Sequence, residues 1–139
     1  MDIKMAIEYR NEVPHIEDYW PLFLSTGWNE IFKMEKSDIE RALANSSFVI
    51  AAYAADKLVG FARAVSDGVM YAAVYDVIVH PDFQKQGIGK RLVENITKLC
   101  KESGVFSVHL FAAEGTEPFY NKAGFKARPQ TMPGMRYEG

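Results

Sequence analysis

The segment from Met70 to Gly104 constrains the fold more than any other part of the chain. It begins with the run MYAAVYDVIVH, which is rich in Val, Ile and Tyr and is halted by Pro81, so a long strand is predicted here. A loop containing Gly87 and Gly89 follows and leads directly into a helix whose apolar residues share one stripe. This succession of strand, glycine loop and helix indicates a chain of mixed α and β elements.

Further elements are predicted on both sides of this segment. Strands are expected at residues 3–10, 48–54, 58–66, 105–111, 125–128 and 135–137, and helices at 14–25 and 37–44 and shortly after Thr116. Pro21 should kink or restart the first helix, and Ser37 with Glu40 has the pattern of a capping box. The predicted class is α/β (α+β), and 139 residues suit one domain spanning 1–139.

Composition and charge narrow the possible functions. Sixteen basic and eighteen acidic residues give a net charge of −2, so a strongly basic domain that coats nucleic acid is not expected. The longest apolar runs are too short to cross a bilayer, and the first residues lack the layout of a secretion signal. Cys100 is the sole cysteine, and it shows no metal-ligand spacing with the three His. We expect a cytoplasmic protein without a metal, a nucleic-acid partner or a membrane partner.

The loop around Gly87 and Gly89 has the properties of an anion site. The first amides of a helix lack intrahelical acceptors, and a glycine without Cβ lets an anion come close to the backbone. Lys85, Lys90 and Arg91 add positive charge. A phosphate or pyrophosphate is the natural guest, although the two glycines could instead merely form a tight turn into the helix.

Two well-known phosphate motifs fit this loop poorly. A dinucleotide fingerprint requires a third glycine, which is missing. A Walker A loop requires Ser or Thr after Gly-Lys, and Arg91 stands there instead.

The residues VIVHPDFQKQGIG, at positions 77–89, resemble the acetyl-CoA motif of the GNAT superfamily of N-acetyltransferases. That motif has Arg or Gln, then Gly three positions on, then Gly or Ala two positions further, matched here by Gln84, Gly87 and Gly89. The stretch FYNKAGF at 119–125 resembles a second family segment, F-Y-x-K-x-G-F. The likeness covers roughly residues 74–128. Gly27-Trp28 and the ending 133–135 are similar to small members grouped with plant plastid amine acetyltransferases and their bacterial relatives.

The resemblance implies a GNAT-like fold and a bound cofactor. The fold has a central mixed, mostly antiparallel sheet that splays at the fourth strand, with helices on both faces and acetyl-CoA in the gap. Backbone groups of Ile78 and Val79 should pair with the pantetheine arm. The residues expected around the pyrophosphate are Gln84, Lys85, Gln86, Gly87, Ile88, Gly89 and Lys90. No metal is implied.

Two residues are candidates for the chemistry. Tyr120 matches the family tyrosine that faces the CoA sulfur and acts as general acid; the alternative is an aromatic ring that packs beside Phe119. Asp76 is the candidate base, because it stands two residues before Ile78 on the same side of the strand. A carboxylate in an apolar strand is costly without a purpose, although Asp76 could simply be partnered or reach solvent.

The acceptor is less constrained than the donor. Aromatic residues that could wall an amine pocket, or belong to the core, are Trp28, Phe32, Tyr71 and Tyr75. The function expected is direct acetyl transfer from acetyl-CoA to a primary amine in a ternary complex, with a small-molecule amine favoured over a protein. The alternative is a catalytically silent CoA-binding regulatory or interaction module. The family likeness also suggests a homodimer.

Overall fold

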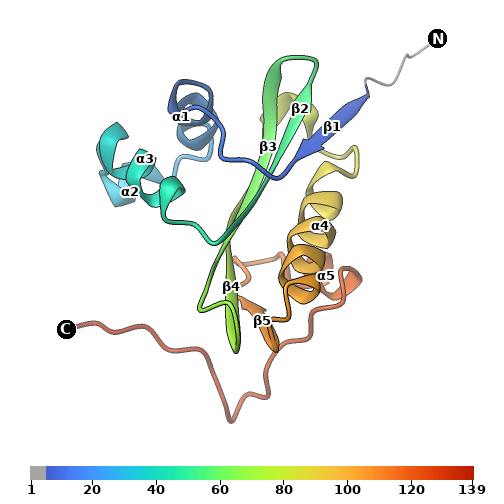
Figure 1. Ribbon diagram of the computed structural model, residues 1–139. Helices are drawn as coiled ribbons and strands as arrows, with labels where there is room; N and C mark the ends of the chain where they lie inside the picture. The colour runs from blue at the N-terminus through green and yellow to red at the C-terminus, as the bar shows by residue number, and fades with distance from the viewer. Residues whose placement is uncertain (1–5) are drawn as a thin grey trace.

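The computed structural model describes residues 6–139, and five strands in it form one sheet in the order β1-β2-β3-β4-β5 (Figure 1). The strands are β1 (Ile7–Arg10), β2 (Phe48–Ala54), β3 (Lys57–Ser66), β4 (Tyr71–Val79) and β5 (Ser107–Leu110). The helices are α1 (Ile16–Leu24), α2 (Asn29–Phe32), α3 (Lys36–Ala44), α4 (Ile88–Glu102) and α5 (Glu117–Lys122), with a 3-10 turn η1 (Pro81–Phe83) before α4.

The sheet is mixed and opens beside its fourth strand. β1 to β4 pair antiparallel, whereas β4 and β5 run parallel. The parallel pairing joins residues 71–74 of β4 to residues 107–110 of β5, so in the described part of the chain the rest of β4 has no partner on that side. The expected GNAT-like sheet, mostly antiparallel and splayed at the fourth strand, is therefore confirmed.

Each face of the sheet is covered by helices, which form two apolar cores (Figure 1). The long helix α4 packs Leu92, Ile96 and Cys100 against one face. On the other face, α1 and α3 contribute Tyr19, Phe23 and Leu43. Six of the seven residues of β2 are buried, as expected of a strand covered on both sides.

Gly60 on β3 lets α4 lie close to the sheet. A Cβ at this position would stand 3.0 Å from Leu92 Cδ1, 3.1 Å from Ile88 Cγ2 and 3.3 Å from Ala52 Cβ. We expect Gly60→Ala to lower the free energy of unfolding by about 1–3 kcal/mol, because overpacking forces side chains or backbone to shift. Urea denaturation of wild type and variant measures this change, and an unchanged midpoint would show that the core adjusts without cost.

Four details differ from the sequence prediction. Within residues 6–139, the closing strands predicted at 125–128 and 135–137 are absent, because neither stretch forms the backbone ladder with β5 that a strand requires. The capping box predicted at Ser37 and Glu40 is wrong: α3 begins earlier, and Asp38 Oδ2 accepts a hydrogen bond from the Glu35 amide at 3.1 Å. α1 continues through Pro21, and α2 was not predicted. Of the first predicted strand, residues 3–5 lie outside the described residues.

Within residues 6–139, no helix combines the length and the apolar character needed to cross a membrane.

Candidate functional site

The loop before α4 has two residues with a positive φ angle, and one of them is a glycine, which adopts such an angle without strain. Lys85 and Gly87 have φ angles of 62° and 84°, in the left-handed region that favours glycine. A Cβ on Gly87 would meet nothing within 4 Å, so this backbone borders open space. A side chain here would fill the room in which the predicted anion would lie.

The beginning of α4 offers hydrogen-bond donors to that space. The first backbone bond of the helix joins the Arg91 amide, which donates, to the Gly87 carbonyl at 3.1 Å. The amides of Ile88, Gly89 and Lys90 precede it, and the first amides of a helix have no intrahelical acceptor. α4 is fifteen residues long, so its dipole adds to the attraction. The side chains of Lys85, Gln86 and Lys90 are exposed around these amides.

The end of β4 lies beside this loop, where the strand has no β5 partner. Within residues 6–139, Ile78 and Val79 pair with β3 alone, opposite Phe61 and Gly60. The side-chain amide of Gln84 donates to the Val79 carbonyl at 3.1 Å, which ties the loop to the strand. The His80 side chain bonds within its own turn: its Nδ1 accepts a hydrogen bond from the Asp82 amide at 3.0 Å.

Tyr120 lies on α5, which packs next to the beginning of α4. A Cβ on Gly89 would stand 3.4 Å from Cζ of Phe119, so the small residue brings the two helices together. The ring of Tyr120 is half-buried between Phe119 and Phe125, at centroid distances of 5.0 and 6.2 Å. Burial raises the pKa of the Tyr120 hydroxyl above its usual range, so this group keeps its proton at neutral pH.

Asp76 stands at an irregularity in β4. Arg63 pairs with Tyr75 and Phe61 with Ile78, so two positions along β3 correspond to three along β4. The extra residue forms a β-bulge, and Asp76 adopts a φ of 56°. Asp is among the few side chains that tolerate this region. The side-chain type and the backbone shape therefore agree at this position.

The Asp76 carboxylate is held by an ion pair. Arg63 Nε donates to Asp76 Oδ2 at 2.6 Å, and both side chains are about one-fifth exposed. A second Arg63 nitrogen lies 3.4 Å from the Ser46 hydroxyl. Asp76 is therefore a partnered residue, the alternative considered for it above, while its other oxygen accepts no hydrogen bond within residues 6–139.

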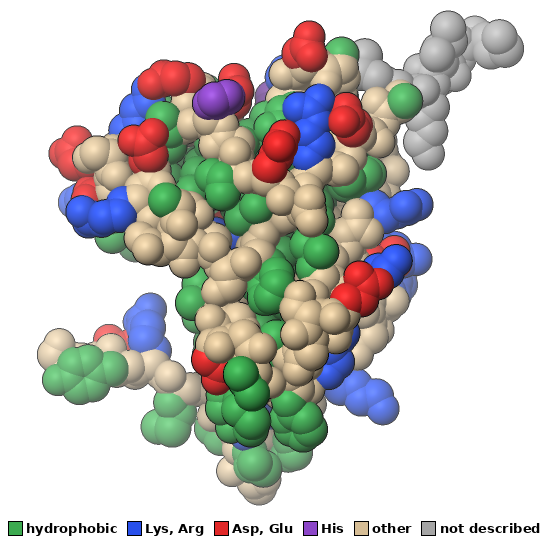
Figure 2. Space-filling model, viewed as in Figure 1, with side chains coloured by type: hydrophobic (Ala, Val, Ile, Leu, Met, Phe, Trp, Pro, Cys, Tyr) green, Lys and Arg blue, Asp and Glu red, His purple; other side chains and the backbone are tan. Residues whose placement is uncertain are grey.

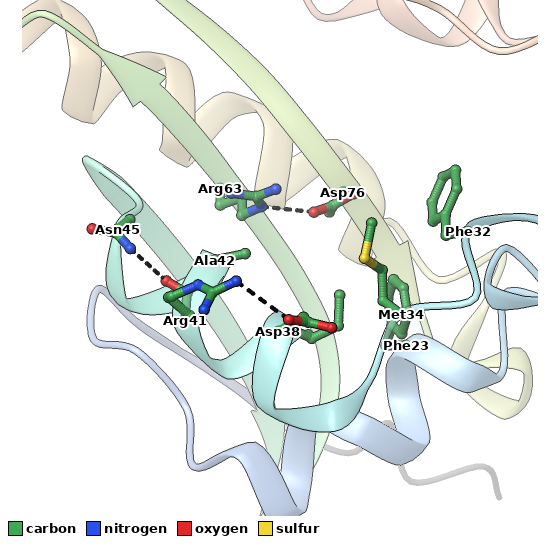
Figure 3. Close-up of a pocket in the computed structure, with 10 residues that line it drawn as sticks. Phe23, Phe32, Met34, Asp38, Arg41, Ala42, Asn45, Arg63 and Asp76 are labelled. Carbon is green, nitrogen blue, oxygen red and sulfur yellow. Dashed lines mark hydrogen bonds and ion pairs between the residues drawn. The ribbon is translucent and has the colours of Figure 1, made fainter.

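Asp76 and Arg63 lie at the bottom of a cleft with a volume of about 530 Å³ (Figure 3). Besides this pair, the cleft is lined by Phe23, Phe32, Met34, Asp38, Ile39, Arg41, Ala42 and Asn45. Phe32 and Met34 stand on one side, and Arg41 pairs with Asp38 on the other at 3.3 Å. The open cleft therefore combines apolar side chains with two carboxylates, each paired with an arginine. No group of three potential metal ligands occurs among the described residues.

The four aromatic residues predicted for the acceptor pocket lie in different places. Phe32 lines the cleft. Tyr75 is next to it, with Arg63 6.0 Å from its ring centre. Trp28 packs against the core under α1 and α3, and Tyr71, at the beginning of β4, contacts His109 with the two rings tilted by 52°. The structure thus brings Phe32 and Asp76 together, and Tyr75 beside them.

Sequence reasoning missed the remaining lining residues, above all Arg63. Arg63 is the one charged residue inside the otherwise apolar run from Leu58 to Val65. A turn at Asp67-Gly68 connects this run to the strand that carries Asp76. Opposite charges in two apolar strands of one hairpin were a signal for this pair. The α3 residues gave no such signal, because a surface helix commonly carries charges.

Most of this chain matches a known protein family. The family model described as "Acetyltransferase (GNAT) domain" matches residues 23–133. An uncharacterized N-acetyltransferase, ycf52, of Pyropia yezoensis is 37% identical over 115 residues, which cover 80% of this chain and 64% of the relative. Serotonin N-acetyltransferase 2, chloroplastic, of Oryza sativa is 33% identical, over 78% of this chain and 60% of the relative. The chain spans less than two thirds of these relatives.

A solved structure shows the same architecture. The GNAT-family acetyltransferase of Streptococcus pneumoniae superposes with a TM-score of 0.82 at 29% identity, covering 96% of this chain and 98% of the other. The family match spans well over half of the chain, and it includes the glycine loop, the bulge at Asp76 and α5. This chain belongs to the GNAT family of acetyltransferases.

Proposed function

We propose that this protein transfers the acetyl group of acetyl-CoA directly to a primary amine, and that the amine is a small molecule. The observation that carries the proposal is the placement of two sites around β4. An anion cradle begins at Gly87, and a cleft with apolar walls ends at Asp76. The strand between them, at Ile78 and Val79, lacks a β5 partner.

The glycine loop supports a donor that carries a pyrophosphate. Helix amides, a glycine open to solvent and exposed Lys85 and Lys90 match what a phosphate needs. The splay beside Ile78 and Val79 leaves backbone groups of β4 for the pantetheine arm. In this arrangement Gln84 and Gln86 lie beside the phosphates, and acetyl-CoA supplies an activated acetyl thioester.

The cleft supports a small amine as acceptor. Its volume of about 530 Å³ falls within the range typical of small-molecule sites, and Phe32 with Met34 offers apolar contacts. The names of two relatives point in different directions: the rice protein is named for serotonin, and a soybean relative is named a histone acetyltransferase. The size of the cleft and its apolar contacts favour the small molecule.

Two residues handle the protons in this proposal. An alkylamine with a pKa near about 10.4 is almost entirely protonated at pH 7, and transfer requires the neutral form. The Asp76 oxygen that is not bonded to Arg63 accepts the proton of the amine, either directly or through a water molecule. Tyr120 holds a proton for the departing thiolate, since burial keeps its hydroxyl neutral.

A panel of primary amines incubated with acetyl-CoA tests the proposal through the release of free thiol. Release that depends on one class of amine supports the enzyme. The rival function is a silent module that binds CoA without turnover. That rival predicts CoA binding by calorimetry and no amine-dependent release from any member of the panel. The absence of CoA binding would exclude both functions.

We expect Asp76→Asn to lower kcat/KM about 10-fold to 100-fold at pH 7 and to recover part of this loss as the pH rises. The variant keeps the shape and the tolerance for a positive φ, but it removes the charge that receives the proton. At higher pH more of the amine is already neutral, so the base matters less. A pH–rate profile measures this, with Asp38→Asn as the matched control at the other side of the cleft.

Equal losses in the two variants would assign the effect to the charge of the cleft as a whole. A profile of Asp76→Asn parallel to that of wild type would leave Asp76 as a structural partner of Arg63.

The cytoplasmic location and the span of one domain over residues 1–139 stay predictions. The rice relative is named as a chloroplast protein.

A further inference from the structure

Tyr19 is a polar residue that α1 buries next to the candidate site. The residue is 1% exposed, and its ring packs edge-on against the ring of Phe61 on β3, at a centroid distance of 4.8 Å. Phe23, which lines the cleft, stacks on the Tyr19 ring at a centroid distance of 6.0 Å. Tyr19 therefore stands directly behind one wall of the cleft.

The Tyr19 ring lies over the part of the sheet that carries the ion pair of the cleft. Arg63 follows Phe61 by two positions on β3, so the two side chains project from the same face of the sheet. Ile78 of β4 packs in the same core as Tyr19, and Asp76 stands two positions before it in the bulge. The residues beneath Tyr19 are therefore the neighbours of the Arg63–Asp76 pair along both strands.

The hydroxyl of Tyr19 has no protein partner among residues 6–139. Burial is the main cause that raises its pKa, the Asp76 charge raises this pKa further, the Arg63 charge lowers it, and no hydrogen bond contributes. Both charges therefore lie near enough to act on the hydroxyl, but neither group is bonded to it. The carboxylates of α1 itself, Glu17 and Asp18, are exposed, and Figure 2 shows acidic side chains on the outer surface of α1 to α3.

This hydroxyl and the Asp76 carboxylate together offer the partners of a water molecule. Within residues 6–139, no side-chain nitrogen or oxygen is both fully buried and unpaired. Because the Tyr19 hydroxyl is unpaired, it must touch accessible space, and the 1% exposure of the whole residue keeps that contact small. The Asp76 oxygen that is not bonded to Arg63 is a second unpaired polar atom. A buried water needs about two to four polar partners, and these two atoms supply the first of them.

We propose that Tyr19 is a positioning residue, whose hydroxyl holds the water molecule through which the amine proton reaches Asp76. The inference rests on the proposed acetyl transfer and selects the water route over direct transfer. An N–H bond of the ammonium group breaks and its proton passes to the water, while one O–H proton of the water passes to the unpaired Asp76 oxygen. The Tyr19 hydroxyl donates a hydrogen bond to the water oxygen and keeps its own proton. The amine is then neutral and can attack the thioester.

Tyr19→Phe tests the proposal, because it removes the hydroxyl and keeps the ring. We expect kcat on the best amine to fall about 3-fold to 30-fold at neutral pH through the loss of one positioned hydrogen bond, while KM for acetyl-CoA stays unchanged. The free energy of unfolding, measured in urea, should stay the same or rise, because a buried hydroxyl without a protein partner is unfavourable. The matched control is Tyr53→Phe, which changes the same core beside Arg10 and should keep wild-type kcat.

A double-mutant cycle with Asp76→Asn identifies the group through which Tyr19 acts. If the hydroxyl serves proton transfer to Asp76, adding Tyr19→Phe to Asp76→Asn should cost less than about 2-fold, since the effects of coupled residues are not additive. The same fold-loss in both backgrounds would overturn the proposal. A normal kcat in Tyr19→Phe, an equal loss in Tyr53→Phe, or a loss confined to KM for acetyl-CoA would also overturn it. A wild type that releases no thiol with any amine would instead overturn the proposed acetyl transfer and, with it, this inference.

Discussion

Tyr120→Phe is expected to lower kcat by about 10-fold to 10³-fold on the best amine substrate, with little change in folding or in CoA affinity. The substitution removes the hydroxyl and keeps the ring that packs between Phe119 and Phe125. Proton transfer by a positioned group typically contributes about 10²–10⁴-fold. A thiolate with a reference pKa near about 8.5 leaves without full assistance, which places the loss at or below that range.

The pH dependence gives this prediction a second measurement. Burial raises the pKa of Tyr120 above the ordinary value near about 10, so the proton is present throughout the neutral range. Wild-type kcat should therefore fall only in strongly alkaline solution, as the hydroxyl ionises, and Tyr120→Phe should lack that fall. Equal losses in kcat and kcat/KM would assign the hydroxyl to the transition state.

Tyr53→Phe is the matched control for Tyr120. Burial also raises the pKa of Tyr53, but this residue lies on β2, on the far side of β3 from β4. The control should keep wild-type turnover. If Tyr120→Phe also turns over normally, Tyr120 is a packing residue and the role implied by the family is wrong.

Gly87→Glu should weaken CoA binding at least about 100-fold in a calorimetric titration. Its side chain would enter the open space in front of the first amides of α4. The carboxylate would occupy the place of a phosphate and repel it, and a tenfold change in affinity corresponds to about 1.4 kcal/mol. The positive φ of 84° adds a folding cost of about 1–3 kcal/mol for a residue with Cβ.

Gly104→Glu separates the two effects of that substitution. Gly104 follows the other end of the same helix, has a φ of 90°, and a Cβ there would also meet nothing within 4 Å. Both variants should therefore lose similar thermal stability, while Gly104→Glu keeps its CoA affinity. Unchanged affinity in Gly87→Glu would remove the loop from the proposed donor site.

Most of the fold could be predicted from the sequence because its signals are local. The stripe of Leu92, Ile96 and Cys100 defines α4, and the apolar runs of β2 and β4 define central strands. The segments that failed depend on partners elsewhere. Residues 125–128 and 135–137 alternate as strands do, but alternation alone does not determine whether a segment pairs with a sheet edge, and both stretches lie outside the sheet described for residues 6–139.

In the candidate site, too, the parts with a local sequence signal could be predicted and the parts that depend on distant contacts could not. The glycine loop could be predicted, because Gly87 and Gly89 lie at the beginning of a helix. Asp76 was found as a charge in an apolar strand, but its partner was not, since pairing with Arg63 depends on the register of two strands and on a bulge. The cleft wall is formed by Met34, in the loop between α2 and α3, and by Ile39 on α3, and no local sequence pattern encodes how these elements dock on the sheet.

The bulge at Asp76 has a consequence for any substitution made there. A positive φ of 56° is tolerated by Asp, Asn and Gly, but other side chains pay a conformational penalty. Alanine scanning at this position would therefore combine a lost charge with a distorted strand, and it would exaggerate the apparent importance of the carboxylate. Asparagine isolates the charge, and glycine keeps the backbone shape while removing the side chain. Because both variants keep the curvature of β4, the loss from wild type to asparagine measures the share of the charge, and the further loss from asparagine to glycine measures the share of the remaining side chain.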